Sequence, residues 1–141
     1  GGMHGADRIG GLSSANGIVF GRIAGASAAL AAQNAPEVAP KTDIDLPQHG
    51  IATADADRLT RSLKHTMSTY CMINRTEAGL SKAQHELESL QDEATALNKP
   101  HANDSEIAAL ARLQSQIQLA MEMVKAMRKR TDSLGSHYRA D

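Results

Sequence analysis

Apolar residues recur at alternating steps of three and four in three segments of the chain's second half. The segments run from about Asp55 to Ile73, from about Thr76 to Leu97, and from near Asp104 or Ser105 onward. This spacing gathers the apolar side chains on one face of an α-helix, so each segment is predicted to be helical. The predicted faces comprise Leu59, Leu63, Met67 and Tyr70 in the first helix, Leu80, Ala83, Leu87, Leu90, Ala94 and Leu97 in the second, and Leu110, Leu113, Ile117, Ala120, Val124 and Met127 in the third.

Residues that favour helix ends separate these segments. Thr53 or Asp55 is suited to cap the first helix, and residues 98–103, which include a proline, favour a turn between the second and third. The cations at 128–130 suit the negative end of the third helix, and Gly135 is predicted to stop it. Because short connections make successive helices antiparallel, the sequence predicts an antiparallel three-helix bundle.

The first part of the chain has a different pattern, in which small and apolar residues dominate. A helix is predicted from about Ala15 to Ala32, with Ser13 and Ser14 as N-cap candidates and Gly10 and Gly11 in the loop before it. Glycine recurs at every fourth position within this helix, at Gly17, Gly21 and Gly25. The bare face that results can lie against a flat ligand or against another backbone, and the periodicity alone leaves both alternatives open.

Two other interpretations of this segment are disfavoured by its chemistry. A signal peptide or membrane span is opposed by Arg22 in the middle of residues 17–32, because a charge at the membrane centre costs about 2.5–3.5 kcal/mol. The apolar stretch is also shorter than the ~20 residues that a spanning helix needs. A nucleotide-binding phosphate loop needs a lysine after its second glycine, but Gly11 and Leu12 follow Gly10.

Composition narrows the function further. The formal net charge is −1 with acidic and basic residues interspersed, which disfavours a nucleic-acid partner. Cys71 is the only cysteine, so an internal disulfide is excluded and a reducing compartment is favoured. The six histidines are not spaced as ligand pairs, so no metal site is predicted. Residues 34–52 contain three prolines and no helical period, and are predicted to link residues 1–33 to a helical domain at 53–141.

Two motifs, one at each end of the chain, resemble the same protein family. Residues 4–25, HGADRIGGLSSANGIVFGRIAG, resemble the segment of succinate dehydrogenase and fumarate reductase flavoproteins written H-G-A-N-R-L-G-G-N-S-L followed by V-F-G-R-x-A-G. Residues 130–141, RTDSLGSHYRAD, resemble the family's R-x-E-S-R-G-x-H-x-R-x-D. The matching residues are Arg8, Gly10, Gly11, Ser13, Phe20, Gly21, Arg22 and Gly25 at the start, and Arg130, Ser133, Gly135, His137, Arg139 and Asp141 at the end.

The chain departs from the family pattern at a few positions. Leu12 stands where the family has asparagine, Ser14 where it has leucine, Asp132 where it has glutamate and Leu134 where it has arginine. Leu12 and Ser14 lie where the resemblance places the flavin, so redox tuning and substrate identity are not carried over. L-aspartate oxidases share the architecture and remain an alternative.

The resemblance implies a site at the start of the chain. It implies that Arg8 binds a carboxylate of a C4-dicarboxylate substrate, with His4 lining the same site. It further implies that FAD lies against Gly10, Gly11, Leu12, Ser13 and Ser14, whose helix start would stabilise negative charge on the flavin ring. The expected activity is hydride transfer between the dicarboxylate and FAD. No catalytic residue is expected in this chain, because the family's proton-donating arginine has no counterpart in it.

The same resemblance implies partners and a location. Residues 1–33 correspond to the end of an FAD-binding domain whose dinucleotide-binding portion is expected to precede this sequence, and an iron–sulfur subunit is the expected electron partner. The chain alone is expected to be inactive. The protein is expected in the cytoplasm or peripherally on the inner face of the membrane. His137 and Arg139 are expected to tie the bundle to the flavin domain.

A second hypothesis from a different class is a non-enzymatic helical module that binds a partner helix through its apolar seams. A self-contained module of this kind would leave no exposed apolar face on the first helix. The flavoprotein hypothesis instead predicts that the face of residues 15–32 stays uncovered, or that the segment alone is poorly ordered or prone to aggregate.

Overall fold

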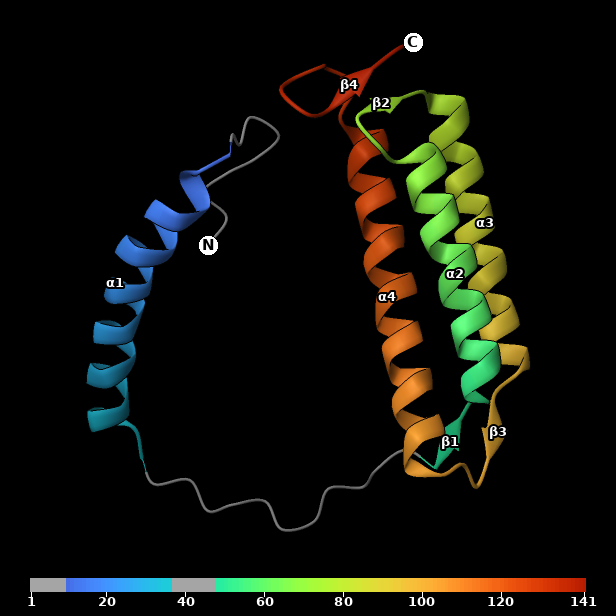
Figure 1. Cartoon of the computed structure of the whole chain (residues 1–141), viewed down its shortest axis with the longest axis horizontal. Coiled ribbons are helices and arrows are strands. Elements are labelled where there is room, and N and C mark those ends of the chain that lie inside the picture. The colour runs from blue at the N-terminus through green and yellow to red at the C-terminus, as the bar shows by residue number, and fades with distance from the viewer. Residues whose placement is uncertain (1–9, 37–47) are drawn as a thin grey trace. The chain divides into compact units, whose positions relative to one another are not determined.

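A computed structural model describes residues 10–36 and 48–141 of the chain (Figure 1). The chain divides into two units, residues 1–45 and 46–141, and each is considered by itself. The described part of the first unit is mainly α1, which spans Leu12–Asn34. The second unit contains α2 (Thr53–Tyr70), α3 (Glu77–Ala96) and α4 (Asp104–Lys129).

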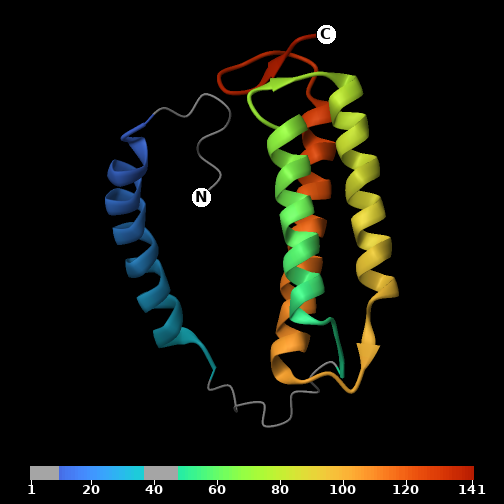
Figure 2. The ribbon, with the colours of Figure 1, turned by 45° about the vertical axis from the view of Figure 1, so that its right-hand side comes forward.

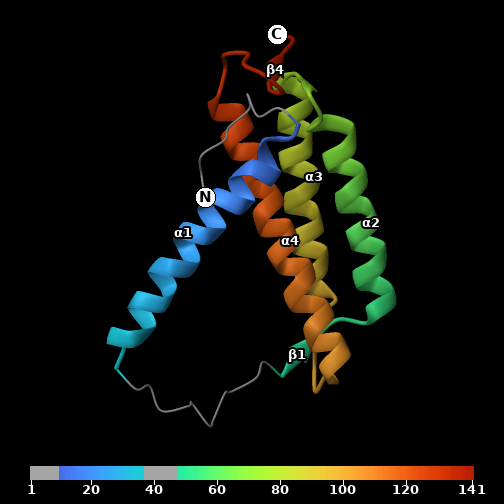
Figure 3. The ribbon, with the colours of Figure 1, turned by 60° about the vertical axis from the view of Figure 1, so that its left-hand side comes forward.

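The second unit is an antiparallel three-helix bundle. Figures 2 and 3 show α2, α3 and α4 side by side from two further directions, with α3 running opposite to the other two helices. Each helix contacts the other two. The predicted fold class, mainly helical with a three-helix bundle, is therefore confirmed.

The bundle core consists of the predicted apolar faces, and small and branched aliphatic side chains fill it. Met67, Tyr70, Leu97 and Met127 from those faces are partly buried against the core. Fifteen apolar residues form the buried cluster: Ile51, Ala56, Leu59, Leu63, Cys71, Leu80, Ala83, Leu87, Leu90, Ala94, Leu110, Leu113, Ile117, Ala120 and Val124. The alanines on α3 and α4 let the helices approach closely, which suits a chain with three aromatic residues in all.

Helix ends were predicted with mixed success. The α3 helix begins after Thr76, whose Oγ1 accepts from the Gly79 N–H at 3.1 Å. Asn103 caps α4 in a reciprocal capping box with Glu106. The predicted cap of α2 was wrong, because Ala52 is its N-cap and offers no side-chain acceptor. The predicted stop at Gly135 was also wrong.

The α4 helix ends at Lys129, well before that glycine. Arg130 is already extended, and its N–H still bonds to the Ala126 carbonyl at 3.2 Å. Gly135 instead has a φ of 57° in a tight turn, where Leu134 and His137 exchange backbone hydrogen bonds. Glycine suits this turn because a side chain is strained at positive φ.

Two short strand pairs close the ends of the bundle. At one end β1 (His49–Gly50) pairs antiparallel with β3 (Lys99–Pro100). At the other end β2 (Asn74–Arg75) pairs in parallel with β4 (Tyr138–Arg139). Ile51, just after β1 and within the segment predicted to be a linker, is fully buried in the bundle core.

The α1 helix is long and almost entirely exposed. None of its residues is buried, and Ile18, Val19 and Ile23 are each more than half exposed. At 23 residues it is long and apolar enough to cross a membrane, so the argument from length against a membrane span was wrong. The core helix of a soluble protein and a signal sequence near an N-terminus meet the same two criteria, and Arg22 lies near the middle of this helix.

Gly50 is the position in the bundle where a side chain fits worst. An added Cβ would lie 2.6 Å from the Ala102 Cβ and 2.7 and 2.8 Å from backbone atoms of Glu106 and Ile107. Gly50→Ala should therefore lower the free energy of unfolding by about 1–3 kcal/mol in a urea titration followed by circular dichroism. Gly25→Ala is the control, since nothing lies within 4 Å of its added Cβ. An unchanged midpoint for Gly50→Ala would contradict this packing.

Candidate functional site

The predicted flavin-contacting residues form the start of α1. Gly11 precedes the helix with a φ of 88° and caps it without any side-chain hydrogen bond. Leu12, Ser13 and Ser14 are then its first three residues. The helix therefore starts three residues earlier than predicted, and the prediction that Ser13 and Ser14 are N-caps was wrong.

This helix start fits an electron-rich group. The backbone N–H groups of Leu12, Ser13 and Ser14 have no acceptor within the helix, and together they carry roughly half a positive charge. The first turn contains no acidic residue that would cancel this charge. An added Cβ at Gly10 or Gly11 would meet nothing within 4 Å, so space remains beside the loop. The residues present thus suit the edge of a flavin ring.

The two predicted substrate-binding residues, His4 and Arg8, lie outside the described residues. Their placement and roles remain predictions.

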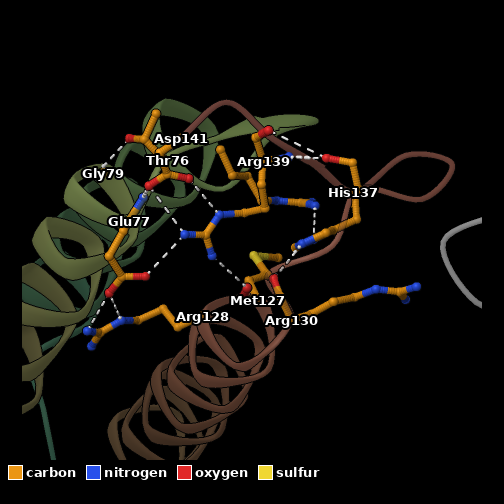
Figure 4. A network of polar contacts seen from close by, with 11 residues as sticks. Thr76, Glu77, Gly79, Met127, Arg128, Arg130, His137, Arg139 and Asp141 are labelled. Atoms are coloured by element: carbon orange, nitrogen blue, oxygen red, sulfur yellow. Dashed lines mark hydrogen bonds and ion pairs between the residues drawn. The ribbon is translucent and has the colours of Figure 1, made fainter.

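The C-terminal motif forms a second cluster of polar side chains, at the end of the bundle that carries β2 and β4 (Figure 4). Side chains alternate between the two faces of a strand. Accordingly, His137 and the Arg139 side chain are 5% and 6% exposed, whereas Tyr138 between them is 52% exposed. The motif therefore directs its histidine and second arginine inward, onto the connection between α2 and α3.

Arg139 joins the last residue of the chain to α3. Its Nε lies 3.0 Å from Asp141 Oδ1, and its Nη2 lies 3.3 Å from Glu77 Oε2. These charge-assisted contacts raise the pKa of Arg139, chiefly through the hydrogen bond to Asp141. The same hydrogen bond holds the pKa of Asp141 below its usual value. Both groups are therefore charged at neutral pH.

Asp141 also serves the N-terminus of α3. Its Oδ2 accepts from the Glu77 N–H at 2.5 Å, so this helix start receives one acceptor from Thr76 and one from the chain's last residue. The Glu77 carboxylate in turn binds Arg128 of α4, with 2.6 Å between Oε1 and Nη2. Arg128 also donates to Gln84. The cluster thus ties α3, α4 and the C-terminal segment together.

His137 makes two hydrogen bonds that fix its tautomer. Its Nδ1 lies 2.7 Å from Arg75 Nη1, and its Nε2 lies 3.0 Å from the Arg130 carbonyl oxygen. Because a guanidinium only donates, Nδ1 accepts and Nε2 carries the proton. Arg75 also donates to the Cys71 carbonyl from Nε and Nη2. His137 is therefore held between two arginines by contacts that leave neither ring nitrogen for proton transfer.

Burial shifts the pKa values of Arg75, which contacts His137, and of Cys71. It lowers the pKa of the Arg75 guanidinium and raises the pKa of the Cys71 thiol. The Cys71 thiol is therefore uncharged at neutral pH, as is typical of a small buried apolar residue. No catalytic role was assigned to Cys71 from the sequence, and this environment offers none.

Within the described residues, the contacts of His137 and Arg139 lie inside the bundle unit. They tie the C-terminal segment to the α2–α3 connection. Our expectation that they tie the bundle to the flavin domain stays a prediction. Sequence reasoning missed their partners Arg75 and Glu77. Pairing with residues about 60 positions away leaves no local pattern to detect.

The described residues contain no group of three or more metal-ligating side chains. A groove of about 420 Å³ lies between α3 and α4, where Gln91, Thr95, Gln114 and Gln118 contribute amides and a hydroxyl. None of the predicted site residues lines this groove.

Comparison with known proteins identifies the family. A family model described as the C-terminal part of fumarate reductase flavoproteins matches residues 60–141, which is more than half of the chain. The chain belongs to this family. The match covers α3, α4, the C-terminal segment and most of α2, so the bundle is the flavoprotein C-terminal helical domain.

Curated relatives agree with this family. The chain is 30% identical to a fumarate reductase (CoM/CoB) subunit from Methanothermobacter marburgensis. It is also 30% identical to an uncharacterized FAD-dependent oxidoreductase from Methanocaldococcus jannaschii. Each match takes in the whole chain but only 27% of the relative. No solved structure matches the chain.

The contacts of Asp141 should make the stability of the folded chain depend on pH in the acidic range. A carboxylate whose pKa is lowered by folding contributes stability above its unfolded pKa, and this contribution is lost as the pH falls through the folded value. Asp141→Asn should therefore lower the melting temperature at pH 7. The difference from the unsubstituted chain should shrink below about pH 4 and vanish once Asp141 is protonated in both folded and unfolded chains. A difference that stays constant from pH 7 to the acid limit would contradict the assignment.

Proposed function

We propose that this chain is the C-terminal portion of an FAD-dependent flavoprotein of the succinate dehydrogenase and fumarate reductase type. The reaction proposed for the whole protein is hydride transfer between a C4-dicarboxylate and the flavin. The observation that carries the proposal is the open helix start at Leu12–Ser14, which lies inside the motif that resembles this family. The family membership of the bundle supports it independently.

The start of α1 is proposed to bind the flavin. Bound FAD would supply the hydride acceptor or donor. The backbone N–H groups of Leu12, Ser13 and Ser14 would face the edge of its ring where negative charge collects on reduction. Gly10 and Gly11 would allow the loop backbone to approach the ring, because no Cβ intervenes. This role needs backbone donors only, so the departures at Leu12 and Ser14 leave it intact.

Arg8 is proposed to bind one carboxylate of the substrate, with His4 beside it. A guanidinium can donate two parallel hydrogen bonds to a carboxylate and keeps its charge at any physiological pH. Such a contact would orient the dicarboxylate relative to the flavin. The group that donates or accepts the proton is proposed to lie in another part of the protein.

The remaining partners are proposed from the length of the relatives and from the family resemblance. Because the chain spans 27% of each relative, the dinucleotide-binding portion is proposed to precede this sequence in the same protein. An iron–sulfur subunit is the proposed electron partner, in the cytoplasm or on the inner face of the membrane. The chain alone would then neither retain FAD tightly nor turn over substrate.

Two observations favour this proposal over the alternatives. One relative is named a fumarate reductase, which favours a C4-dicarboxylate reaction over that of L-aspartate oxidase. The family model that the bundle matches favours part of a larger flavoprotein over a self-contained helical module.

The test of the proposed site is Arg8→Ala in the full-length flavoprotein. Loss of two charge-assisted hydrogen bonds, at about 1.5–3 kcal/mol each, should lower kcat/KM for fumarate or succinate by roughly a hundredfold to ten-thousandfold. The visible absorbance of bound flavin should be unchanged. Arg8→Lys is the matched control, because it keeps the charge but not the paired hydrogen-bond geometry. Its kcat/KM should lie between those of the unsubstituted protein and Arg8→Ala. Turnover close to normal in Arg8→Ala would refute the assignment.

A further inference from the structure

His137 is a buried histidine whose two ring nitrogens both have hydrogen-bond partners. The residue is 5% exposed. Its Nδ1 lies 2.7 Å from Arg75 Nη1, and its Nε2 lies 3.0 Å from the Arg130 carbonyl oxygen (Figure 4). Because a guanidinium only donates, Nδ1 must keep its lone pair for this contact to form. The contact between Arg75 and His137 therefore accepts only the neutral ring.

A proton on Nδ1 is incompatible with this contact. It would remove the acceptor and set two donors against each other across 2.7 Å. It would also place a second positive charge beside the Arg75 guanidinium. Two like charges at this distance repel strongly where little water screens them. The ring can therefore take up a proton only when it separates from Arg75.

Arg75 is held in place by other contacts, so the ring is the partner that must move. The guanidinium donates from Nε and Nη2 to the Cys71 carbonyl, at 3.3 and 3.2 Å, and from Nη1 to the Ser136 carbonyl at 3.4 Å. These acceptors are uncharged, and so is the Cys71 thiol at neutral pH, because burial raises its pKa. Among the described residues, no carboxylate contacts either Arg75 or His137.

The charged groups of the neighbouring elements pair with one another rather than with this histidine. Arg139, in the same segment, contacts Asp141 and also Glu77 at the start of α3. Arg130, directly after α4, contacts Asp132 at 3.4 Å. Each of these carboxylates thus already faces an arginine. A protonated ring would gain no opposite charge to offset its repulsion from the guanidinium beside it.

The ring cannot separate from Arg75 without disturbing the strand pair beside it. Arg75 is part of β2, and His137 directly precedes β4. The Tyr138 N–H, next in the chain, donates to the Ile73 carbonyl at 3.0 Å. Loss of the side-chain contact therefore removes a link between the two strands. The packing of the three helices is not involved, because uncharged apolar side chains form their shared core.

We propose that His137 is a pH-sensitive switch whose protonation in mildly acidic solution opens the pairing of β2 with β4. The C-terminal segment is then held on the bundle chiefly by the contacts of Arg139, while the three helices stay packed. The switch is a property of the bundle unit. It depends on neither flavin nor substrate, and it goes beyond the function proposed above.

The experiment is residue-resolved amide hydrogen exchange on the 141-residue chain at pH 7.5 and 5.5, corrected for the intrinsic exchange rate at each pH. A histidine exposed to water has a pKa of about 6.5, so opening should be about tenfold more favourable at the lower pH. Protection of the Tyr138 amide should fall by this factor, while that of Leu113 in the middle of α4 stays constant. Asp141 stays charged over this range, because folding lowers its pKa. Equal protection of Tyr138 at both pH values would overturn the proposal.

His137→Gln separates this histidine from the other titrating groups. The glutamine amide can accept from Arg75 and donate to the Arg130 carbonyl, but it takes up no proton in this range. Protection of Tyr138 should therefore be equal at the two pH values in this variant. His85→Gln, on the exposed side of α3, is the matched control and should keep the tenfold change. A tenfold change that persists in His137→Gln would overturn the proposal, because another group would then be responsible.

An NMR titration of the His137 ring gives a second readout in the unsubstituted chain, which decides the matter if His137→Gln leaves Tyr138 unprotected at both pH values. Uptake of the proton and loss of Tyr138 protection should have the same midpoint. A ring that becomes protonated while Tyr138 keeps its protection would overturn the proposal, because the contact with Arg75 would then not control the strand pair.

Discussion

The bundle end depends on one buried guanidinium. Arg139 lies between the carboxylates of Glu77 and Asp141, and through them it connects the chain's last residues to the first turn of α3 and to Arg128 of α4. Removing it would leave Asp141 without its arginine partner and Glu77 with Arg128 alone. The attachment lies in the same segment as the parallel pairing of β2 with β4, the buried His137 and the exposed Tyr138.

This constraint explains why a motif that resembles one found in flavoproteins contains no group available for chemistry. Both nitrogens of the His137 ring have partners within the bundle, and the charges of Arg139 and Asp141 satisfy each other. Chemistry is proposed at the other end of the sequence, where the start of α1 offers backbone donors without a side-chain cap. The C-terminal motif thus builds the domain, and the N-terminal motif is proposed to contact the cofactor.

The parts of the fold that depend on local spacing could be predicted from the sequence. The alternating steps of three and four between apolar residues predicted all three bundle helices and the faces that they bury. On α3, for example, this face runs from Leu80 to Ala94. The start of α1 was placed three residues late, because Ser13 and Ser14 are good caps in isolation but Gly11 adopts the positive φ that ends the loop. Gly135 was taken for a helix stop because it is the first glycine after α4. The strand pairs were not predicted, since two-residue strands joined across more than 45 positions leave no periodic signal.

The most direct test of the role of Arg139 is residue-resolved amide hydrogen exchange on the 141-residue chain carrying Arg139→Leu. The amides of Tyr138 and Ala140 bond to the carbonyls of Ile73 and Arg75. They should exchange about tenfold or more quickly once the buried cation is removed, while the amide of Leu113 in the middle of α4 keeps its protection. Unchanged protection of Tyr138 and Ala140 would contradict the view that Arg139 holds the C-terminal segment on the bundle.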